Sequence, residues 1–270
     1  MGAGSSELMR LDVFLVEKGL VESRSKARWV VENGHVKVNG IVCTKVSKKV
    51  SPGDVVEVVE NLKYVSRAGY KLEGLFEEFP VELTGKIVCD IGSSTGGFVD
   101  FFLQHGASKV YAVDVNVEQL HEKLKRDQRV VPIRANAKEL DPSLIAEELD
   151  FISIDVSFIS VRKLVQTVKK LASAKTKIIV LIKPQFEIPE GHKGVVRDKL
   201  IHVEAIKAVL TTYREAGFDC EYLTYSKMKG AEGNIEFFAV FRVGGEKNVC
   251  NEIIDGDIIT VVERAWEDNG

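Results

Sequence analysis

The 270 residues include 37 lysines and arginines and 40 aspartates and glutamates, so the formal net charge is −3, and 45% of the residues are hydrophobic. These proportions are typical of a globular protein, and the length allows one large domain or a large and a small one. Apolar runs such as IIVLI are far shorter than the roughly 18 residues of a membrane-spanning helix, so we expect no membrane partner.

Four cysteines stand at positions 43, 89, 220 and 250, without a Cys-x-x-Cys pair or a nearby histidine cluster. This spacing argues against a zinc site and against a disulfide framework. We therefore expect no bound metal and a reduced, cytoplasmic protein.

The first nine residues, MGAGSSELM, lack an apolar core, and we expect a disordered leader rather than a signal peptide. The segment that follows is basic, because residues 10–49 hold nine lysines and arginines against four aspartates and glutamates. Residues 63–270 hold 28 against 32. This asymmetry indicates a polyanionic partner that binds one end of the molecule.

Residues 10–60 are predicted to form a small α/β domain. Apolar residues from Leu11 recur at helical spacing until Gly19, and Ser23 or Ser25 is placed to cap a second helix that Gly34 ends. The stretch HVKVNG then alternates like a strand into an Asn-Gly turn, and VSPGDVVEVVE supplies a further turn and strand.

Basic and polar side chains gather on the second helix and the hairpin of this domain. The candidate RNA-binding residues are Arg24, Lys26, Arg28, Lys37 and Asn39. The stretch RLDVFLVEKGLVESRSKARWVVENGHVKVNG, followed by SPGDVVEV, resembles the S4 RNA-binding domain. The resemblance implies RNA as a partner, whereas the charges alone are also compatible with a solvated helix face.

After a linker at residues 61–67, residues 68–244 alternate between strands and helices. The expected strands are KIVCDIG, KVYAVDV, RVVPIRA, DFISIDV, KIIVLIK, DCEYLTY and IEFFAVFRV. Segments such as VRKLVQTVKKLA carry apolar residues at helical spacing between them. This alternation predicts a doubly wound, Rossmann-like and mostly parallel α/β sheet, whose ligands bind beyond the carboxyl ends of the strands.

The first of these strands leads into the glycine-rich stretch CDIGSSTGGFVDFF, and Asp114 ends the second strand. An acidic residue there can accept hydrogen bonds from ribose hydroxyls. Asp114 does not separate S-adenosylmethionine from a nicotinamide dinucleotide, since both contain an adenosine ribose. The glycines lack the Gly-x-Gly-x-x-Gly spacing that suits a pyrophosphate, and Asp90 suits a cationic ligand, so we favour S-adenosylmethionine.

Four ionisable residues are expected at the same rim of the sheet. Lys71 lies on a helix before the first strand, Asp155 and Lys183 end two strands, and Glu236 lies near the start of the last strand. Each alone has an ordinary structural explanation. Together they resemble, in chain order, the Lys-Asp-Lys-Glu tetrad of the FtsJ-type ribose methyltransferases.

With the S4-like domain in front, residues 10–243 resemble the TlyA family, also called hemolysin A. The resemblance implies a ribose 2′-O-methyltransferase that uses S-adenosylmethionine and acts on ribosomal RNA. The donor-binding residues that it implies, together with those above, are Asp90, Gly92, Ser94, Gly96, Gly97, Phe98, Asp114, Asn136 and Asp155. Three positions depart from FtsJ: Thr95 and Phe98 flank the two glycines in place of proline and tryptophan, and Asn136 replaces a carboxylate on the adenine side.

The chemistry explains why a tetrad is needed. A ribose hydroxyl is a poor nucleophile near neutral pH, and methyl transfer requires it to be oriented and relieved of its proton. Lys183 can act as a base only if its pKa falls, for instance beside a second cation such as Lys71. Asp155 and Glu236 oppose that fall, so the sequence leaves the direction open.

Three other functions remain compatible with parts of the sequence: a catalytically weak, RNA-binding ribosome assembly factor, a hemolysin-like membrane-active protein, and a nicotinamide-dependent oxidoreductase. Residues 245–270 are expected to form a helical tail that the resemblance does not explain. The sequence does not indicate an oligomeric state.

Overall fold

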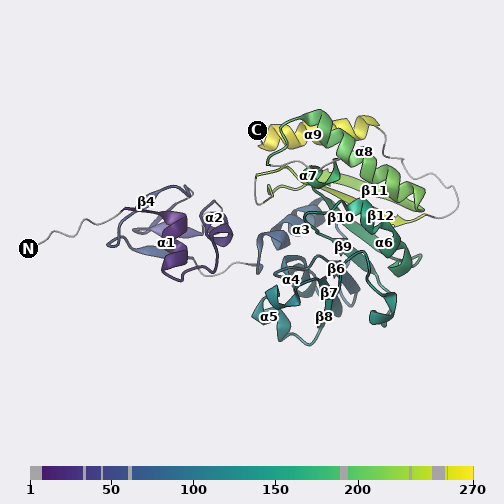
Figure 1. Ribbon diagram of the computed structural model, residues 1–270, viewed down its shortest axis with the longest axis horizontal. Coiled ribbons are helices and arrows are strands. Elements are labelled where there is room, and N and C mark those ends of the chain that lie inside the picture. Colours follow the sequence, from purple (N-terminus) through teal and green to yellow (C-terminus); the bar gives the residue numbers. More distant parts are fainter. Residues whose placement is uncertain are drawn as a thin grey trace, which may run out of the picture. The chain divides into compact units, whose positions relative to one another are not determined.

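The chain folds into two compact units, residues 1–63 and 64–270, in the computed structural model (Figure 1). The structure describes residues 8–32, 35–43, 45–59, 63–188, 194–230, 233–244, 253 and 255–269. Most of the expected leader, including residues 1–7, lies outside this range. Of the described residues, none belongs to a helix that is both long and apolar enough to cross a bilayer.

Among its described residues, the smaller unit contains two helices and five short strands. They are β1 (Met9–Arg10), α1 (Leu11–Glu17), α2 (Arg24–Glu32), β2 (Val36–Val38), β3 (Ile41–Val42), β4 (Lys49–Val50) and β5 (Val56–Val58). The strands form an antiparallel β3-β2-β5 sheet and a separate β1–β4 pair. Met9, which the sequence assigns to the leader, pairs with Val50 in that second pair.

Local sequence explains how the two helices of this unit begin and pack. Ser23, and not Ser25, caps α2, because its Oγ accepts a hydrogen bond from the N–H of Lys26 at 3.2 Å. Gly34, the expected end of this helix, lies outside the described residues. Leu15 of α1 and Val30 of α2 are fully buried, so the apolar stripes of the two helices form the core of the unit.

The larger unit is built from alternating strands and helices. In chain order they are α3 (Arg67–Glu78), β6 (Ile87–Ile91), α4 (Gly97–Gln104), β7 (Lys109–Asp114), η1 (Val117–Gln119), α5 (Glu122–Lys125), β8 (Val130–Arg134), η2 (Pro142–Leu144), β9 (Phe151–Ile154), η3 (Val161–Leu164), α6 (Val165–Leu171), β10 (Lys177–Ile182), α7 (Pro184–Glu187), α8 (Lys199–Glu215), β11 (Phe218–Tyr225), β12 (Phe237–Val243) and α9 (Asp255–Asn269).

Its seven strands form one sheet in the order β11-β12-β10-β9-β6-β7-β8. The strands from β10 to β8 are mutually parallel, whereas β12 runs antiparallel to both β10 and β11. This arrangement confirms the predicted doubly wound, mostly parallel sheet, and each of the seven expected strands is present.

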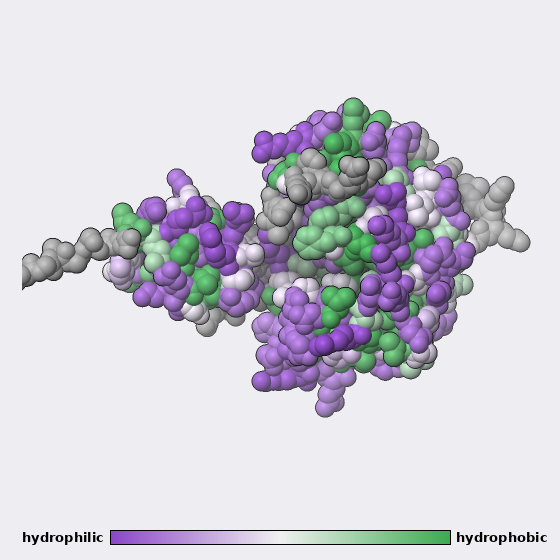
Figure 2. All heavy atoms as spheres, viewed as in Figure 1, coloured by the Kyte–Doolittle hydropathy of each residue, from purple (hydrophilic) through white to green (hydrophobic). Residues whose placement is uncertain are grey.

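Helices cover both faces of this sheet (Figure 1). Ile178 and Val180 of β10 belong to the core that α6, α8 and α9 complete, whereas Ile179 and Leu181 face the core that α3 and α4 complete. Because side chains alternate along a strand, a strand covered on both faces must be apolar throughout, as β10 is. The face of the molecule seen in Figure 2 carries apolar patches among many hydrophilic side chains.

Two segments that the sequence treats as accessories are integrated into the larger unit. In the expected linker, Tyr64 is 1% exposed and Arg67 already begins α3. In the expected C-terminal tail, α9 buries Ile258 and Ala265 in the same core as α8. The linker and the tail therefore contribute to the packing of this unit.

The chain path creates a crevice beside β6. From β6 the chain proceeds to β7 and β8 on one side and then crosses to β9 and β10 on the other. The loops that follow β6 and β9 consequently diverge at their carboxyl ends, which is where parallel α/β sheets bind their ligands.

Candidate active site

A hollow of about 210 Å³ lies at this crevice. It is lined by Ser66, Ala68, Asp90, Gly92, Ser93, Ser94, Thr95, Gly97, Phe98, Asp155, Ser157 and Lys183. Seven of these residues were predicted from the sequence. Ser66, Ala68, Ser93, Thr95 and Ser157 were not singled out, although Ser93 and Thr95 belong to the glycine-rich stretch itself.

The glycine-rich turn between β6 and α4 brings the backbone close to β9. Gly92 has a φ of +88°, and a Cβ at this position would collide with the carbonyl oxygen of Asp155. Ser94 also adopts a left-handed φ of +48°, and its N–H donates to Asp114 Oδ2 at 2.9 Å. Asp114 does not line the hollow itself, but it holds the turn that does.

Asp90 places a buried carboxyl group in the wall of the hollow. It is 1% exposed, and its Oδ1 accepts a hydrogen bond from Ser153 Oγ at 2.6 Å. Burial raises the pKa of Asp90 to about 7, with the nearby carboxylates of Asp155 and Asp114 acting in the same direction against the Ser153 hydrogen bond. A cationic ligand would stabilise the ionised form of this group.

Lys183 follows β10 and carries its ammonium group to the end of β9. Its Nζ lies 2.6 Å from Asp155 Oδ1 and donates to Ser157 Oγ at 3.0 Å. Burial disfavours the charged form of Lys183, but the carboxylates of Asp155 and Glu236 outweigh burial and raise its pKa. Lys183 is thus an ammonium in this arrangement. The direction of its pKa shift, which the sequence left open, is upward.

Lys71 and Glu236, the other two members of the tetrad expected from the sequence, form a second ion pair. Lys71 Nζ, on α3, lies 2.5 Å from Glu236 Oε2, just before β12, and both side chains are buried. Burial tends to raise the pKa of Asp155, but the charges of Lys183 and Lys71 lower it. Lys71 therefore acts on a carboxylate of the other pair. The tertiary structure therefore brings four residues from distant parts of the chain into one alternating cluster of charges.

Besides Asp114, two further predicted donor-binding residues do not line the hollow. Asn136 is exposed, and its Oδ1 accepts a hydrogen bond from the N–H of Lys138 in a local turn. Gly96 has a φ of +94° at the start of α4 and lies against Leu124, so it shapes the turn. The sequence indicated where the glycine-rich turn lies. It did not distinguish the residues of the turn that line the hollow from those that only bend the backbone.

An aromatic pair lies beside the charged cluster and was not predicted. Phe158 follows Ser157, is 91% exposed and has a left-handed φ of +67°. Its ring centroid is 5.4 Å from that of Phe186 on α7, three residues after Lys183. An exposed aromatic ring in a strained backbone conformation suggests a binding role, since it gains little from burial.

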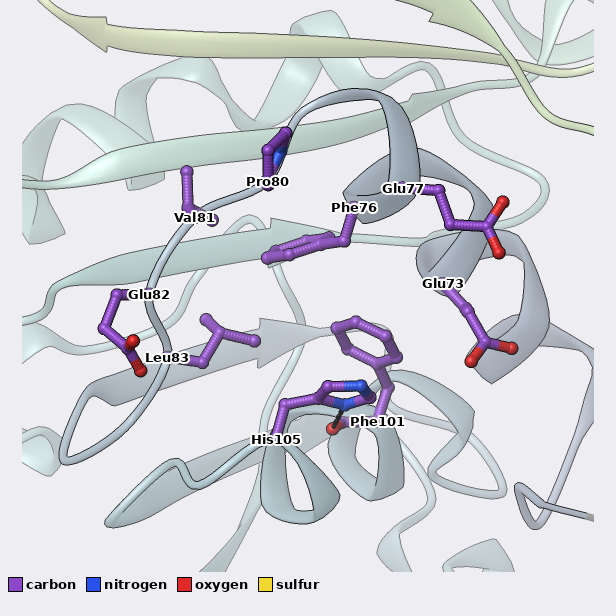
Figure 3. Close-up of a pocket in the computed structure, with 9 residues that line it drawn as sticks. All are labelled: Glu73, Phe76, Glu77, Pro80, Val81, Glu82, Leu83, Phe101 and His105. Atoms are coloured by element: carbon purple, nitrogen blue, oxygen red, sulfur yellow. Dashed lines mark hydrogen bonds between the residues drawn. The ribbon is translucent and has the colours of Figure 1, made fainter.

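A second hollow, of about 330 Å³, lies between α3, α4 and the segment that joins α3 to β6, and it shares no lining residue with the first (Figure 3). Phe76, Phe101 and His105 place their rings in it, and the centroid of His105 is 4.1 Å from that of Phe101. Glutamates surround these rings, but no lysine lines this hollow. The charged pairs described above are thus features of the first hollow.

In the smaller unit, the five RNA-binding candidates have different environments. Arg24 Nη2 lies 3.0 Å from Oδ2 of the buried Asp12, whereas Arg28 Nε lies 3.8 Å from the exposed Glu32 Oε1. Burial lowers the pKa of Lys26, whose Nζ lies 5.0 Å from the Trp29 ring centroid.

The last two RNA-binding candidates lie in the hairpin. Asn39, at the turn, accepts a hydrogen bond from the N–H of Val55 and donates one to Asp54, both at 2.9 Å, and so ties the hairpin to the loop before β5. Lys37 is half-buried on β2.

Comparisons with known proteins agree with this architecture. Residues 64–243 match the FtsJ-like methyltransferase family and residues 9–56 match the S4 domain. The chain is 43% identical over 238 residues to the protein named Hemolysin A of Brachyspira hyodysenteriae, covering 86% of this chain and 99% of that one. It is 35% identical over 239 residues to 16S/23S rRNA (cytidine-2′-O)-methyltransferase TlyA of Mycobacterium tuberculosis, covering 86% and 89%.

A solved structure from Streptococcus thermophilus, provisionally named a hemolysin, superposes with a TM-score of 0.76 at 35% identity and covers 98% of each chain. The first hollow also suits the donor of a methyltransferase, because the buried Asp90 favours a cation and the turn lacks the glycine spacing of a pyrophosphate site. The chain therefore belongs to the TlyA (hemolysin A) family, in which an S4 domain precedes an FtsJ-like methyltransferase domain, and its methyl donor is S-adenosylmethionine.

Proposed function

We propose that this enzyme transfers a methyl group to a ribose 2′-hydroxyl of ribosomal RNA in the cytoplasm, where ribosomal subunits are found. The observation that carries the proposal is the Lys183–Asp155 pair at 2.6 Å, which lines the hollow at the switch point of the sheet. The printed name of the Mycobacterium relative, a cytidine-2′-O-methyltransferase, supports the same reaction. The S4 domain supports RNA as the substrate.

In this mechanism Lys183 acts as an ammonium rather than as a neutral amine. When bound, S-adenosylmethionine supplies a methyl group on a sulfonium with a neutral thioether as leaving group. Lys183 Nζ donates a hydrogen bond to the hydroxyl oxygen and orients it. The hydroxyl proton becomes strongly acidic as its oxygen is alkylated, so a weakly basic carboxylate such as that of Asp155 suffices to accept it.

The remaining tetrad residues maintain this arrangement. Glu236 helps to keep Lys183 charged, and Lys71 neutralises Glu236 in the buried pair. Asp90 lines the hollow and would stabilise the positive charge of a bound donor, and the turn held by Asp114 would form one wall of the donor site. The exposed guanidinium groups of α2 anchor RNA phosphates, which increases affinity without selecting a sequence.

The test is transfer of a labelled methyl group from S-adenosylmethionine to unmodified small and large ribosomal subunits and to their naked RNAs. Digestion to nucleosides then shows whether the label is on the ribose. Lys183→Met is the informative variant, and Lys163→Met, at an exposed position of η3, is its matched control. Transfer to a 2′-oxygen by the wild type and by Lys163→Met, but not by Lys183→Met, is the expected result.

Label on a base, or undiminished transfer by Lys183→Met, would contradict the proposal. Donor binding without transfer to any subunit or RNA would instead favour an RNA-binding assembly factor. Isothermal titration with S-adenosylmethionine separates these outcomes, since it reports donor binding independently of the RNA.

A further inference from the structure

A buried glutamate that the mechanism does not use connects the two loops of the candidate active site. Glu187, the last residue of α7, is 2% exposed. Its Oε2 accepts a hydrogen bond from Ser160 Oγ at 2.5 Å, and its Oε1 accepts one from the N–H of Val161 at 2.8 Å. Both partners lie more than twenty residues earlier in the chain, in the loop that leaves β9.

Arg162 closes this network from the solvent side. Its Nε lies 3.2 Å from Glu187 Oε2, and its Nη2 donates to the Glu187 carbonyl oxygen at 2.6 Å. The buried carboxylate is thus compensated by a cation and by two further donors. Such full compensation is required, because an ionised group that is buried without partners is strongly destabilising.

Capping of the short helix η3 does not by itself explain this glutamate. Ser160 already caps η3, because its Oγ accepts a hydrogen bond from the N–H of Arg162 at 3.2 Å. A local serine therefore performs the task that a helix start requires. Glu187 adds a connection between segments that follow different strands, β9 and β10.

This connection fixes the positions of the residues that carry the proposed reaction. Asp155 and Ser157 lie on the β9 loop, whereas Lys183 lies one residue before α7, and their polar atoms meet at 2.6 and 3.0 Å. The loop also carries Phe158 with a φ of +67°, a conformation that persists only where the surroundings hold it. A displacement of either loop by one ångström would separate these groups.

We infer that Glu187 is a positioning residue for methyl transfer: it ties the β9 loop to α7 and so fixes Asp155 and Ser157 against Lys183. This inference rests on the proposed function, since it assigns Glu187 a task in that reaction. Glu187 acts through the tetrad residues and does not itself contact the donor or the RNA.

The experiment compares Glu187→Ala and Glu187→Gln with the wild type in single-turnover methyl transfer at saturating donor and RNA. Glu187→Ala is expected to transfer on the order of 10²-fold more slowly, the loss that an ångström of misplacement causes. Glu187→Gln, which still accepts hydrogen bonds but lacks the charge facing Arg162, is expected to recover part of the rate. The donor dissociation constant, measured by titration, is expected to change less than about threefold, since Glu187 does not line the donor hollow.

Asp150→Asn is the matched control, because Asp150 is a carboxylate that also joins two segments, accepting from the N–H of Ile87 at 3.0 Å. It lies at the amino ends of β6 and β9, the opposite edge of the sheet. Thermal unfolding of each variant shows whether the loss of rate merely follows a loss of stability. If Asp150→Asn with an equal fall in Tm slows transfer as much as Glu187→Ala does, the role of Glu187 is only structural.

Hydrogen exchange of residues 155–162 provides a second measurement, because release of the tether is expected to speed exchange at the amide of Val161. A wild type that transfers methyl groups and a Glu187→Ala variant that transfers them equally fast would overturn this inference alone. A wild type that transfers none to any RNA would overturn the proposed function and this inference together.

Discussion

Lys71 and Glu236 form a buried ion pair, 2.5 Å from Nζ to Oε2, that joins helix α3 to the residue preceding β12. The two residues are 165 positions apart in the chain, and their side chains are only 8% and 3% exposed. Burial of such a pair stabilises a protein only weakly, but removal of one partner leaves an uncompensated charge.

Removal of either partner is therefore expected to be costly. Glu236→Leu should lower the free energy of unfolding by about 3–5 kcal/mol, because it leaves Lys71 buried and unpaired. The double variant Lys71→Met with Glu236→Leu should recover most of this stability without recovering methyl transfer. Chemical denaturation and single-turnover assays of the wild type and of these two variants test both statements. Recovery of activity in the double variant would show that the pair serves stability alone.

The raised pKa of Lys183 predicts the pH dependence of the chemical step. Its charged form contributes stability below its ordinary pKa of 10.5, and that contribution is lost as the pH rises through the higher folded value. The lowered pKa of Asp155 keeps its carboxylate ionised down to below pH 3.8. Single-turnover rates at saturating donor should therefore be nearly constant from about pH 7.5 to 9. A tenfold rise per pH unit would instead identify a neutral Lys183 as the base.

Asp90 predicts a pH dependence of donor binding. Because burial raises its pKa from 3.8 to about 7, the folded state holds the proton more firmly than the unfolded state does, and stability falls as the pH rises from about 4 to 7. The cationic donor favours the ionised form, so its affinity should increase through pH 7 with release of a proton. Titration calorimetry in buffers of different ionisation enthalpy measures that release. Asp90→Asn should abolish it and should bind the donor more weakly above pH 7.

Phe158 is predicted to contact the RNA, because its ring is 91% exposed beside the charged cluster. Phe158→Gly should weaken productive RNA binding by about 1–3 kcal/mol, the contribution of one aromatic ring stacked on a base. The same substitution should not lower Tm, since glycine tolerates the φ of +67° without strain. Phe158→Tyr should behave like the wild type. Equal transfer by all three chains would exclude a substrate contact at this position.

Replacement of Arg24 and replacement of Arg28 are predicted to have different effects, although both residues lie on the basic helix α2. Arg28→Ala should weaken RNA binding uniformly and reduce the slope of log K against log salt by about one. Arg24→Ala should in addition lower Tm, because Asp12 is 3% exposed and would lose the bond at 3.0 Å. Fluorescence anisotropy with labelled ribosomal RNA at several salt concentrations, with a thermal melt of each variant, distinguishes the two effects. An unchanged salt slope for both would exclude α2 as the phosphate-binding surface.

Local sequence was sufficient for much of the fold. Strands such as β10 are uniformly apolar because both of their faces are covered. Helix α1 ends just before Gly19, and α2 begins after the capping Ser23. The glycine-rich stretch marked the turn between β6 and α4, where Gly92 has a φ of +88°. These features depend on residues near one another in the chain, so their periodicity and composition reveal them.

Residue types also indicated the tetrad, through its resemblance to a known pattern of four residues. That pattern does not say which of the four residues form ion pairs with one another. Lys183 faces Asp155, and Lys71 faces Glu236, only because the sheet order places β9 beside β10 and carries α3 towards β12. The upward shift in the pKa of Lys183 follows from this pairing, since a balance between burial and two carboxylates cannot be read from spacing.

The amino-acid sequence by itself determined the two-part organisation and the doubly wound sheet, because these follow from local periodicity and composition. Only the tertiary structure decided that Asn136 lies away from the first hollow, that Phe158 lies beside the charged cluster and that Glu187 joins two loops. The physical reason is that each of these depends on contacts between segments distant in the chain. The protonation of the site depends on the same contacts, because burial and neighbouring charges exist only once the chain has folded.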